Sequence, residues 1–411
     1  MLSSHQKTIY EALGRDPIHP FPARMAPGIA LDALGNGRDS LRVLDPMAGS
    51  GTVLAVARAN GHRAYGVDLD PLAVLLAGVW TRTIDRERVV DKANEVLSRA
   101  RASMRQLAVS QAYPPHADKE TRKFIRYWFD DYVRRQLAAL AAAIRRTHDP
   151  VTRDALWCGF SRLIITKQAG ASLALDLSHS RPHKKFDRAP LKPFSRFAAA
   201  IELVVSNCPQ RELGPVGPVS IVKQGDARDL PIDDGSIDLV LTSPPYLNAI
   251  DYLRCSKFSL VWIGHTVREL RQIRAKSVGT EASTQEALDA DWIKALIRQL
   301  RCKPRLSARH HALLATYAWD MGHAMGEVSR VLTRGGRAVY VVGDSTIRGT
   351  FVRNSAIVAT AAARYGLSLV CRHSRDLPAN RRYLPPPSDA SANMMLNARM
   401  RREVVVQFRK A

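Results

Sequence analysis

Residues 239–246 have the sequence LVLTSPPY, a short apolar run that ends at two prolines. An aliphatic run of this length predicts a buried β-strand. Pro244 and Pro245 have no backbone N–H to give to a neighbouring strand, so the strand must end there. Open α/β sheets bind their ligands at the carboxyl ends of the strands. The stretch therefore predicts that Ser243 and Tyr246 lie at a ligand-binding edge.

The prolines also suggest which ligand this turn suits. They restrict the backbone, so the carbonyl oxygens near them become fixed hydrogen-bond acceptors beside the Ser243 hydroxyl and the Tyr246 ring. Fixed acceptors next to an aromatic face suit an exocyclic amino group on a flat base. The alternative is an ordinary proline turn after a strand, and this stretch alone does not decide between the two.

A second pattern of strand and turn lies far upstream. Residues 41–44 predict a strand, and residues 45–52, DPMAGSGT, form a glycine-rich turn before an alanine-rich helix. Glycines let a ligand approach the backbone closely, and the start of the helix presents free N–H groups. The spacing matches neither a dinucleotide fingerprint nor a P-loop. Asp45 would repel a phosphate but attract an ammonium group.

Two further acids are predicted at the same edge of the sheet. Residues 63–67 predict a strand that leads into Asp68, and residues 219–223 predict another that ends at Asp226. An acid about 20 residues after a glycine turn is placed to bind ribose hydroxyls. Turn, spacing and acid together indicate a nucleoside-containing cofactor.

The two motifs DPMAGSGT and TSPPY, in one chain, resemble those of DNA amino-methyltransferases that use S-adenosylmethionine. The SPPY form is similar to the cytosine-N4 branch of that family, whereas the adenine-N6 branch usually has Asp or Asn in place of Ser243. The resemblance implies a doubly wound, mostly parallel Rossmann-like α/β sheet. It implies cofactor contacts from the glycine turn, the acidic strand ends and the N-terminal loop: Phe21, Asp45, Pro46, Ala48, Gly49, Ser50, Gly51, Thr52, Asp68, Leu69, Asp226 and Ala227.

The resemblance also implies a catalytic role for Ser243, Pro244, Pro245 and Tyr246. The Ser243 hydroxyl and the Pro244 carbonyl would accept the amino hydrogens of cytosine, so that the nitrogen lone pair faces the methyl group. Tyr246 would stack through its ring on a base swung out of the duplex. This chemistry needs no metal and no covalent nucleophile. Methylation at cytosine C5 would need a Pro-Cys nucleophile, and Cys208 stands before its proline instead.

The motifs divide the chain into three parts. Residues 1–81 would form the cofactor-binding half, and residues 218–411 the catalytic half with a lid or groove wall at 247–310. Residues 82–217 would be a helical, basic insertion and a candidate DNA-recognition region. Met47 departs from the family, which usually has Phe there. Within the insertion, residues 124–144 carry apolar and aromatic side chains at helical spacing, which predicts core packing.

The charge of the chain points to a polyanionic partner. Its 61 Lys and Arg exceed its 38 Asp and Glu, a formal net charge of +23. Such a surplus raises affinity for phosphate backbones, and we expect double-stranded DNA. The basic segment 181–188 contributes the candidate DNA-binding residues Arg181, Lys184, Lys185 and Arg188; a solvated loop is the alternative.

Other features bear on the compartment. The five cysteines are scattered without a C-x-x-C pair, so neither a zinc site nor a disulfide framework is indicated, and a reducing compartment fits. No run approaches the length of a membrane span, and the first residues lack a signal-peptide core. We therefore expect a cytoplasmic protein with no membrane contact.

Three other functions compete with cytosine-N4 methylation. They are adenine-N6 methylation of DNA, guanine-N2 methylation of RNA, and DNA binding by a catalytically silent protein that keeps the fold. The sequence leaves open the recognition site, the oligomeric state and whether a companion restriction endonuclease exists.

Overall fold

The computed structural model describes residues 7–21, 24–35, 37, 39–175, 177, 182–210, 220–247, 252–279, 285–302, 306–347, 350–376 and 402–411. Its centre is a seven-stranded sheet with the order β3-β2-β1-β4-β5-β9-β8. The strands are β1 (Arg42–Asp45), β2 (Arg63–Asp68), β3 (Ser220–Gln224), β4 (Ile237–Thr242), β5 (Leu332–Gly343), β8 (Leu367–Asp376) and β9 (Arg402–Lys410). β1 to β5 pair in parallel, and β9 runs antiparallel to both β5 and β8. The predicted doubly wound, mostly parallel α/β sheet is confirmed.

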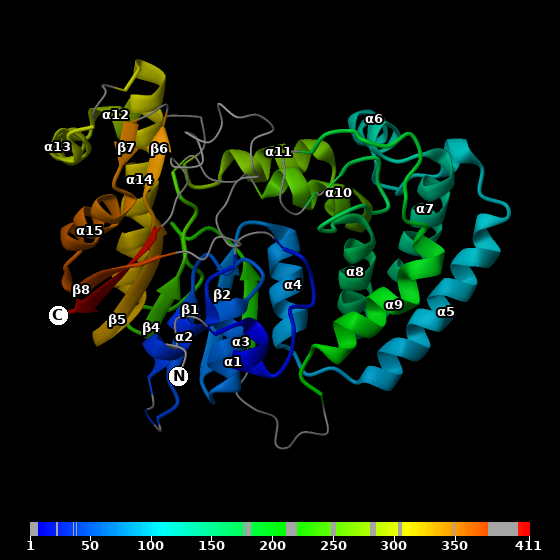
Figure 1. Cartoon of the computed structure of the whole chain (residues 1–411), viewed down its shortest axis with the longest axis horizontal. Coiled ribbons are helices and arrows are strands. Elements are labelled where there is room, and N and C mark those ends of the chain that lie inside the picture. Colours follow the sequence, from blue (N-terminus) through cyan, green and yellow to red (C-terminus); the bar gives the residue numbers. More distant parts are fainter. Residues whose placement is uncertain are drawn as a thin grey trace.

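Helices cover both faces of the sheet and continue beyond one side of it (Figure 1). They are α1 (Ile9–Leu13), α2 (Pro27–Leu34), α3 (Thr52–Ala59), α4 (Pro71–Thr81), α5 (Arg86–Met104), α6 (Lys119–Trp128), α7 (Asp131–Arg145), α8 (Pro150–Ile164), α9 (Pro193–Ser206), α10 (Leu253–Ile263), α11 (Val267–Ala275), α12 (Gln285–Asp289), α13 (Asp291–Leu300), α14 (Ala308–Val331) and α15 (Asn354–Arg364). A 3₁₀ turn (Val109–Gln111) and a small hairpin of β6 (Ser345–Ile347) and β7 (Thr350–Val352) complete the described elements. Among the described residues, none of the helices has the length and apolar character needed to cross a membrane.

The apolar run that ends in the proline turn is a central strand buried on both faces. Leu239 and Leu241 pack in the cluster that contains α2 and α3, whereas Val240 packs in the cluster that contains α14 and α15. All three are fully buried. Side chains alternate between the faces of a strand, so a strand covered on both faces needs an unbroken apolar run.

Helices α5 to α11 pack with α4 in one continuous hydrophobic cluster. Trp80 of α4, Phe160 of α8 and Phe197 of α9 are fully buried in this cluster together with Trp262 of α10. In Figure 1, α5, α7, α8 and α9 stand side by side to the right of the sheet. The helical region α5–α11 therefore shares its core with α4.

The predicted stripe packs in this cluster except at Tyr132; its other members are Phe124, Ile125, Trp128, Phe129, Val133, Leu137, Leu140 and Ile144. Phe129 is buried and meets Trp262 edge-on with ring centroids 5.4 Å apart, as core packing predicts. Tyr132, however, is 53% exposed. The prediction is wrong there because α6 ends at Trp128 and α7 begins at Asp131. The residues of α7 therefore face other directions than they would in one continuous helix.

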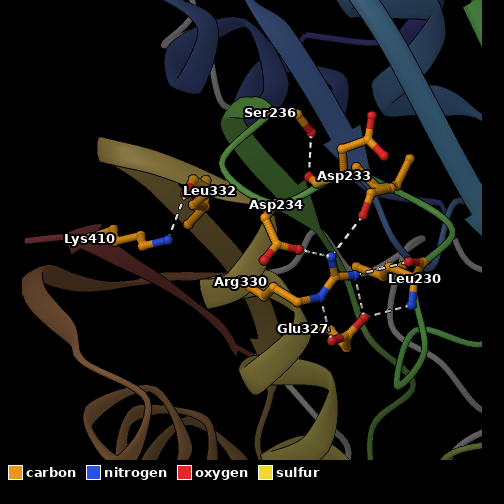
Figure 2. Close-up of polar contacts among 9 residues, drawn as sticks. Leu230, Asp233, Asp234, Ser236, Glu327, Arg330, Leu332 and Lys410 are labelled. Carbon is orange, nitrogen blue, oxygen red and sulfur yellow. Dashed lines mark hydrogen bonds and ion pairs between the residues drawn. The ribbon is translucent and has the colours of Figure 1, made fainter.

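An arginine clamp fixes the segment between β3 and β4 to α14 (Figure 2). The Arg330 guanidinium forms ion pairs with Glu327 at 2.7 Å and Asp234 at 2.5 Å. It also donates to the carbonyls of Leu230 at 3.0 Å and Ile232 at 2.9 Å. Glu327 in turn accepts from the Leu230 N–H at 2.7 Å. The clamp thus holds the chain that leads into the strand of the proline turn.

Candidate active site at the carboxyl edge of the sheet

The glycine turn leaves β1 and enters α3 with a backbone that only glycine adopts easily. Gly49 has a φ of 51° and Gly51 a φ of 86°. A Cβ added to Gly51 would lie 2.8 Å from the Cβ of Ala77 in α4. The turn can therefore sit against α4 only if residue 51 lacks a side chain.

Asp68, at the end of β2, ties the glycine turn to the start of α4. Its Oδ2 accepts the Gly49 N–H at 2.7 Å, and its Oδ1 accepts the Asp70 N–H at 2.9 Å. Burial raises the pKa of Asp68 above its usual value, against the effect of these backbone donors. Each carboxylate oxygen has further lone pairs, so Asp68 can still accept ligand hydroxyls.

Asp45 is a buried carboxyl at the point where the two motifs meet. It is only 4% exposed, and its Oδ1 accepts the Thr242 hydroxyl at 2.7 Å and the Met47 N–H at 3.1 Å. Burial raises the pKa of Asp45 to about 7 despite these hydrogen bonds. A cation beside Asp45 would favour its ionised form. Since Thr242 precedes Ser243, this contact places the glycine turn beside the proline turn.

The proline turn is held by α14 and by β5. The Tyr317 hydroxyl, from α14, donates to the Pro245 carbonyl at 3.1 Å. Burial raises the pKa of Tyr317, so this hydroxyl keeps its proton. The Ser243 hydroxyl donates to the Val341 carbonyl of β5 at 3.1 Å and lies 3.3 Å from the Tyr246 hydroxyl.

The Pro244 carbonyl differs from that of Pro245. No hydrogen bond to the Pro244 carbonyl is made by any residue that the structure describes. The rigid turn therefore offers the Pro244 oxygen as an acceptor, while Tyr317 already occupies that of Pro245.

The N-terminal loop covers the glycine turn. The Phe21 ring is buried, lies 3.7 Å from the place of a Cβ on Gly49, and stacks on Tyr252 with ring centroids 5.8 Å apart. Arg24 donates from Nε to the Ser50 hydroxyl at 3.1 Å. Phe21, a predicted cofactor contact, thus lies against the glycine turn.

Asp226 and Ala227 follow β3, on the far side of β2 from the glycine turn. Ala227 is buried, and Asp226 pairs with Arg228 at 2.7 Å. Burial raises the pKa of Asp226, but the Arg228 donors outweigh it and hold the pKa below its usual value. Arg228 also pairs with Asp320 of α14, so an ion-pair network adjoins this part of the edge.

The candidate DNA-binding residues lie apart from these groups, on the helical region. Arg181 is outside the described residues, whereas Lys184, Lys185 and Arg188 are exposed. The Lys184 ammonium lies 5.7 Å from the ring of Tyr127, which is 56% exposed. The edge therefore brings the cofactor and catalytic candidates together, while the basic candidates form a separate surface.

Several residues of the edge have no signal of their own in the sequence. Tyr317 lies in α14, which carries no motif, and Glu403 is the second residue of β9. Asp70 accepts the Ser256 hydroxyl at 2.5 Å, and burial raises its pKa to about 7. The sequence predicts a site residue at Asp68, in the stretch DLDP of residues 68–71. Only the fold shows that Asp68 faces the glycine turn, whereas Asp70 faces α10.

The turn fits a cofactor that brings both a cation and hydrogen-bonding groups. The Thr52 hydroxyl is buried and has no hydrogen-bond partner among the described residues. A buried hydroxyl without a partner costs free energy, which a ligand atom would recover. Together with the buried Asp45 and the side-chain-free Gly51, it favours a bound amino-acid moiety at this place.

Comparisons with known proteins give distant relatives. No protein-family model matches the chain. The chain is 21% identical over 389 residues to the type II methyltransferase M.MvaI of Kocuria varians, covering 88% of this chain and 84% of that protein. It is 22% identical to the type II methyltransferase M.AvaI of a Nostoc strain, covering 74% of this chain and 68% of that protein.

Solved structures show a similarly distant likeness. A proposed DNA modification methylase of Thermus thermophilus, solved with S-adenosyl-L-methionine, has 18% identity and a TM-score of 0.24, covering 45% of this chain and 51% of its own. A SAM-dependent methyltransferase of Methanosarcina mazei has 8% identity and a TM-score of 0.32, covering 91% and 94% of the two chains.

Proposed function

We propose that this protein is an S-adenosylmethionine-dependent DNA methyltransferase that modifies the N4 amino group of cytosine in double-stranded DNA. One observation carries the proposal: the glycine turn and the proline turn, 197 residues apart in sequence at Asp45 and Thr242, are hydrogen-bonded to each other at one sheet edge. The type II methyltransferases that the chain resembles support the methyl-transfer reaction and DNA as the substrate.

The cofactor candidates divide by chemistry. Asp45 binds the ammonium of the methionine part, and the turn of Pro46, Ala48, Gly49, Ser50, Gly51 and Thr52 receives its carboxylate end. Asp68 and Leu69 lie at the ribose, and Asp226 and Ala227 at the adenine. Phe21 covers the turn and excludes water. When bound, S-adenosylmethionine supplies an electrophilic methyl group.

The proline turn binds and orients the base. The Pro244 carbonyl and the Ser243 oxygen accept the two amino hydrogens, which turns the nitrogen lone pair out of the ring plane. The same acceptors stabilise the positive charge that develops on the nitrogen. Tyr246, half-buried at the turn, offers its ring to the flipped base. The Pro245 carbonyl accepts a hydrogen bond from the Tyr317 hydroxyl, which keeps the turn rigid.

Cofactor binding should release protons at slightly acidic pH. Without ligand, burial raises the pKa of Asp45 from 3.8 to about 7. The contribution of Asp45 to the free energy of unfolding is therefore complete below its unfolded pKa of 3.8, and it is lost as the pH rises through about 7. The cofactor ammonium favours the ionised carboxylate, so binding at pH 6 should release about one proton from Asp45. Calorimetry in two buffers of different ionisation enthalpy measures this number.

Two variants identify the source of that proton. Asp45→Asn should abolish the release and weaken binding. Asp70→Asn should leave the release nearly intact, because Asp70 faces Ser256 rather than the turn. The same proton release in Asp45→Asn as in the unsubstituted protein would contradict an ammonium site at Asp45.

The reaction product should be N4-methylcytosine, with neither N6-methyladenine nor 5-methylcytosine. Ser243 before the prolines motivates this, and the thiol of Cys208 is no competing nucleophile because burial raises its pKa to about 12. DNA methylated by the purified protein is digested to nucleosides and analysed by mass. A dominant methyladenine peak would assign the protein to the adenine-N6 branch, and modification of RNA alone to the guanine-N2 enzymes. Absence of cofactor binding would favour a silent DNA-binding protein.

DNA binding is assigned to the surface shared by α6, α11 and the basic segment. Glu120 of α6 pairs with Arg271 of α11, and the Thr121 hydroxyl accepts the Val267 N–H at 3.0 Å, so the two helices lie together. In Figure 1, α6, α10 and α11 lie along the same upper side of the molecule. α10 follows the proline turn, so a duplex on this side passes close to the reacting base.

Lys184, Lys185 and Arg188 on this side are exposed, as phosphate contacts require. We expect Lys184→Ala with Lys185→Ala to lower the slope of log affinity against log salt by up to about 2, because each phosphate contact contributes about 0.9. The change should be similar for any DNA sequence, since such contacts position the backbone. Binding titrations at several salt concentrations measure the slope.

A matched pair of substitutions tests whether the salt slope depends on where the removed charges lie or only on their number. Lys92 and Arg99 are both already paired with Glu95 on α5. Replacing both by Ala removes the same charge but should leave the slope unchanged. Equal slopes for the Lys184/Lys185 variant and the unsubstituted protein would show that the basic segment is an ordinary solvated loop that does not contact phosphates.

A further inference from the structure

A buried ion pair lies directly behind the proline turn. Glu403 is 8% exposed and is the second residue of β9. Its Oε2 accepts from Arg375 of β8 at 2.6 Å and 3.0 Å. Its other oxygen, Oε1, accepts the Tyr246 hydroxyl at 3.2 Å. The two oxygens of one carboxylate therefore connect the last two strands of the sheet to the catalytic turn.

The sheet topology explains why these residues meet. β9 is antiparallel to β5, so its first residues lie at the edge where the parallel strands end. Glu403 pairs in register with Gly343 at the end of β5 and with Arg375 on β8. The pair thus arises from backbone register, and both side chains are largely withdrawn from solvent, at 11% and 13% exposure.

The hydrogen atoms of this cluster can be assigned from its chemistry. A carboxylate paired with arginine only accepts, so the single hydroxyl hydrogen of Tyr246 points at Glu403. Ser243 also has one hydroxyl hydrogen, which goes to the Val341 carbonyl at 3.1 Å or towards the Tyr246 oxygen at 3.3 Å. In neither arrangement does Tyr246 donate to Ser243, and the lone pairs of Ser243 remain available.

We propose that Glu403 and Arg375 are positioning residues for methyl transfer: they hold Tyr246 as a donor to Glu403, and thereby keep the Ser243 oxygen an acceptor for the substrate amino group. This rests on the proposed function, because Ser243 and Tyr246 are its catalytic residues. The Tyr246 hydroxyl then has a role beside that of the ring. Without an acceptor at residue 403, the Tyr246 hydrogen turns to Ser243 and occupies the lone pair that the substrate needs.

The test compares Glu403→Gln with the unsubstituted protein. The glutamine oxygen would accept from Arg375, so the amide NH₂ group would donate to the Tyr246 oxygen. The hydroxyl hydrogen of Tyr246 would then point away from residue 403. We expect kcat to fall about tenfold, the value of one well-placed hydrogen bond, with KM for DNA and cofactor affinity unchanged. Tyr246→Phe removes the hydrogen that would turn to Ser243 and keeps the ring, so the double variant should be faster than Glu403→Gln alone.

The same two strands provide a matched control. Arg402 and Asp376 form the next pair in register, at 2.8 Å, but are 70% and 74% exposed and do not touch Tyr246. Asp376→Asn removes one negative charge from the hairpin and should leave kcat unchanged. An unchanged kcat in Glu403→Gln, a double variant as slow as Glu403→Gln alone, or an equal loss in Asp376→Asn would each overturn the positioning role.

A measurement without substrate separates this inference from the proposed function. Melting temperatures of the two single variants and the double variant should be non-additive, which reports the Tyr246–Glu403 contact itself. Additive melting shifts would overturn the contact and the positioning role with it. If the shifts are coupled but the unsubstituted protein transfers no methyl group to DNA, the proposed function fails, although the hydrogen bond stands.

Discussion

Replacing Asp68 with alanine should weaken S-adenosylmethionine binding about 100-fold, since a hydrogen bond to a charged group contributes about 1.5–3 kcal/mol. In the proposed function, the substitution removes the acceptor for the ribose. It also removes the acceptors of the Gly49 and Asp70 N–H groups, which hold the glycine turn and the start of α4 in place. Isothermal titration calorimetry measures the affinity, and circular dichroism verifies the fold.

Asp68→Asn is the conservative comparison. An amide has one oxygen, so it can accept from only one of the two backbone donors, and its NH₂ group faces the other. We expect an affinity between those of the alanine variant and the unsubstituted protein. Unchanged affinity in a folded Asp68→Ala protein would remove this residue from the cofactor site.

The second large effect concerns stability. Arg330→Ala should lower the free energy of unfolding by about 3 kcal/mol, because it breaks a network of charged hydrogen bonds and leaves the Leu230 and Ile232 carbonyls without their donor. Urea denaturation followed by circular dichroism measures the change.

Figure 2 also shows the control for that measurement. Lys410 donates one hydrogen bond, at 2.8 Å, to the Leu332 carbonyl. Lys410→Ala also removes a cation, but it should cost only about 1 kcal/mol, the value of a single hydrogen bond. Equal losses in the two variants would show that Arg330 does not act as a clamp.

The strands of the sheet were predictable because local signals define them. Apolar runs that end at Asp45, Asp68 and the proline turn correspond to β1, β2 and β4, within one or two residues. The sequence also predicts two closing strands at residues 367–371 and 403–408 that pair antiparallel, and the pairing of β8 with β9 confirms this. The acids follow the strands, so their arrival at one edge is a consequence of parallel pairing.

Other features depend on packing that the sequence does not encode locally. Residues 247–310 were expected to form a lid or groove wall, yet α10 in this stretch buries Phe258 and Trp262 in the helical core. The lid role itself stays a prediction. Glu403 was missed because its meeting with Tyr246 depends on the register of strands that are distant in sequence.

The position of β9 also affects how the protein folds during synthesis. β9 inserts between β5 and β8, although it leaves the ribosome after both. Until β9 is synthesised, one edge of β5, which contains apolar residues such as Val339 and Val341, has no partner strand. Such an edge can pair with the strands of other chains and cause aggregation. We therefore expect nascent chains stalled before residue 402 to need chaperone protection, and the hydrogen bond between Tyr246 and Glu403 to form only when synthesis has passed β9.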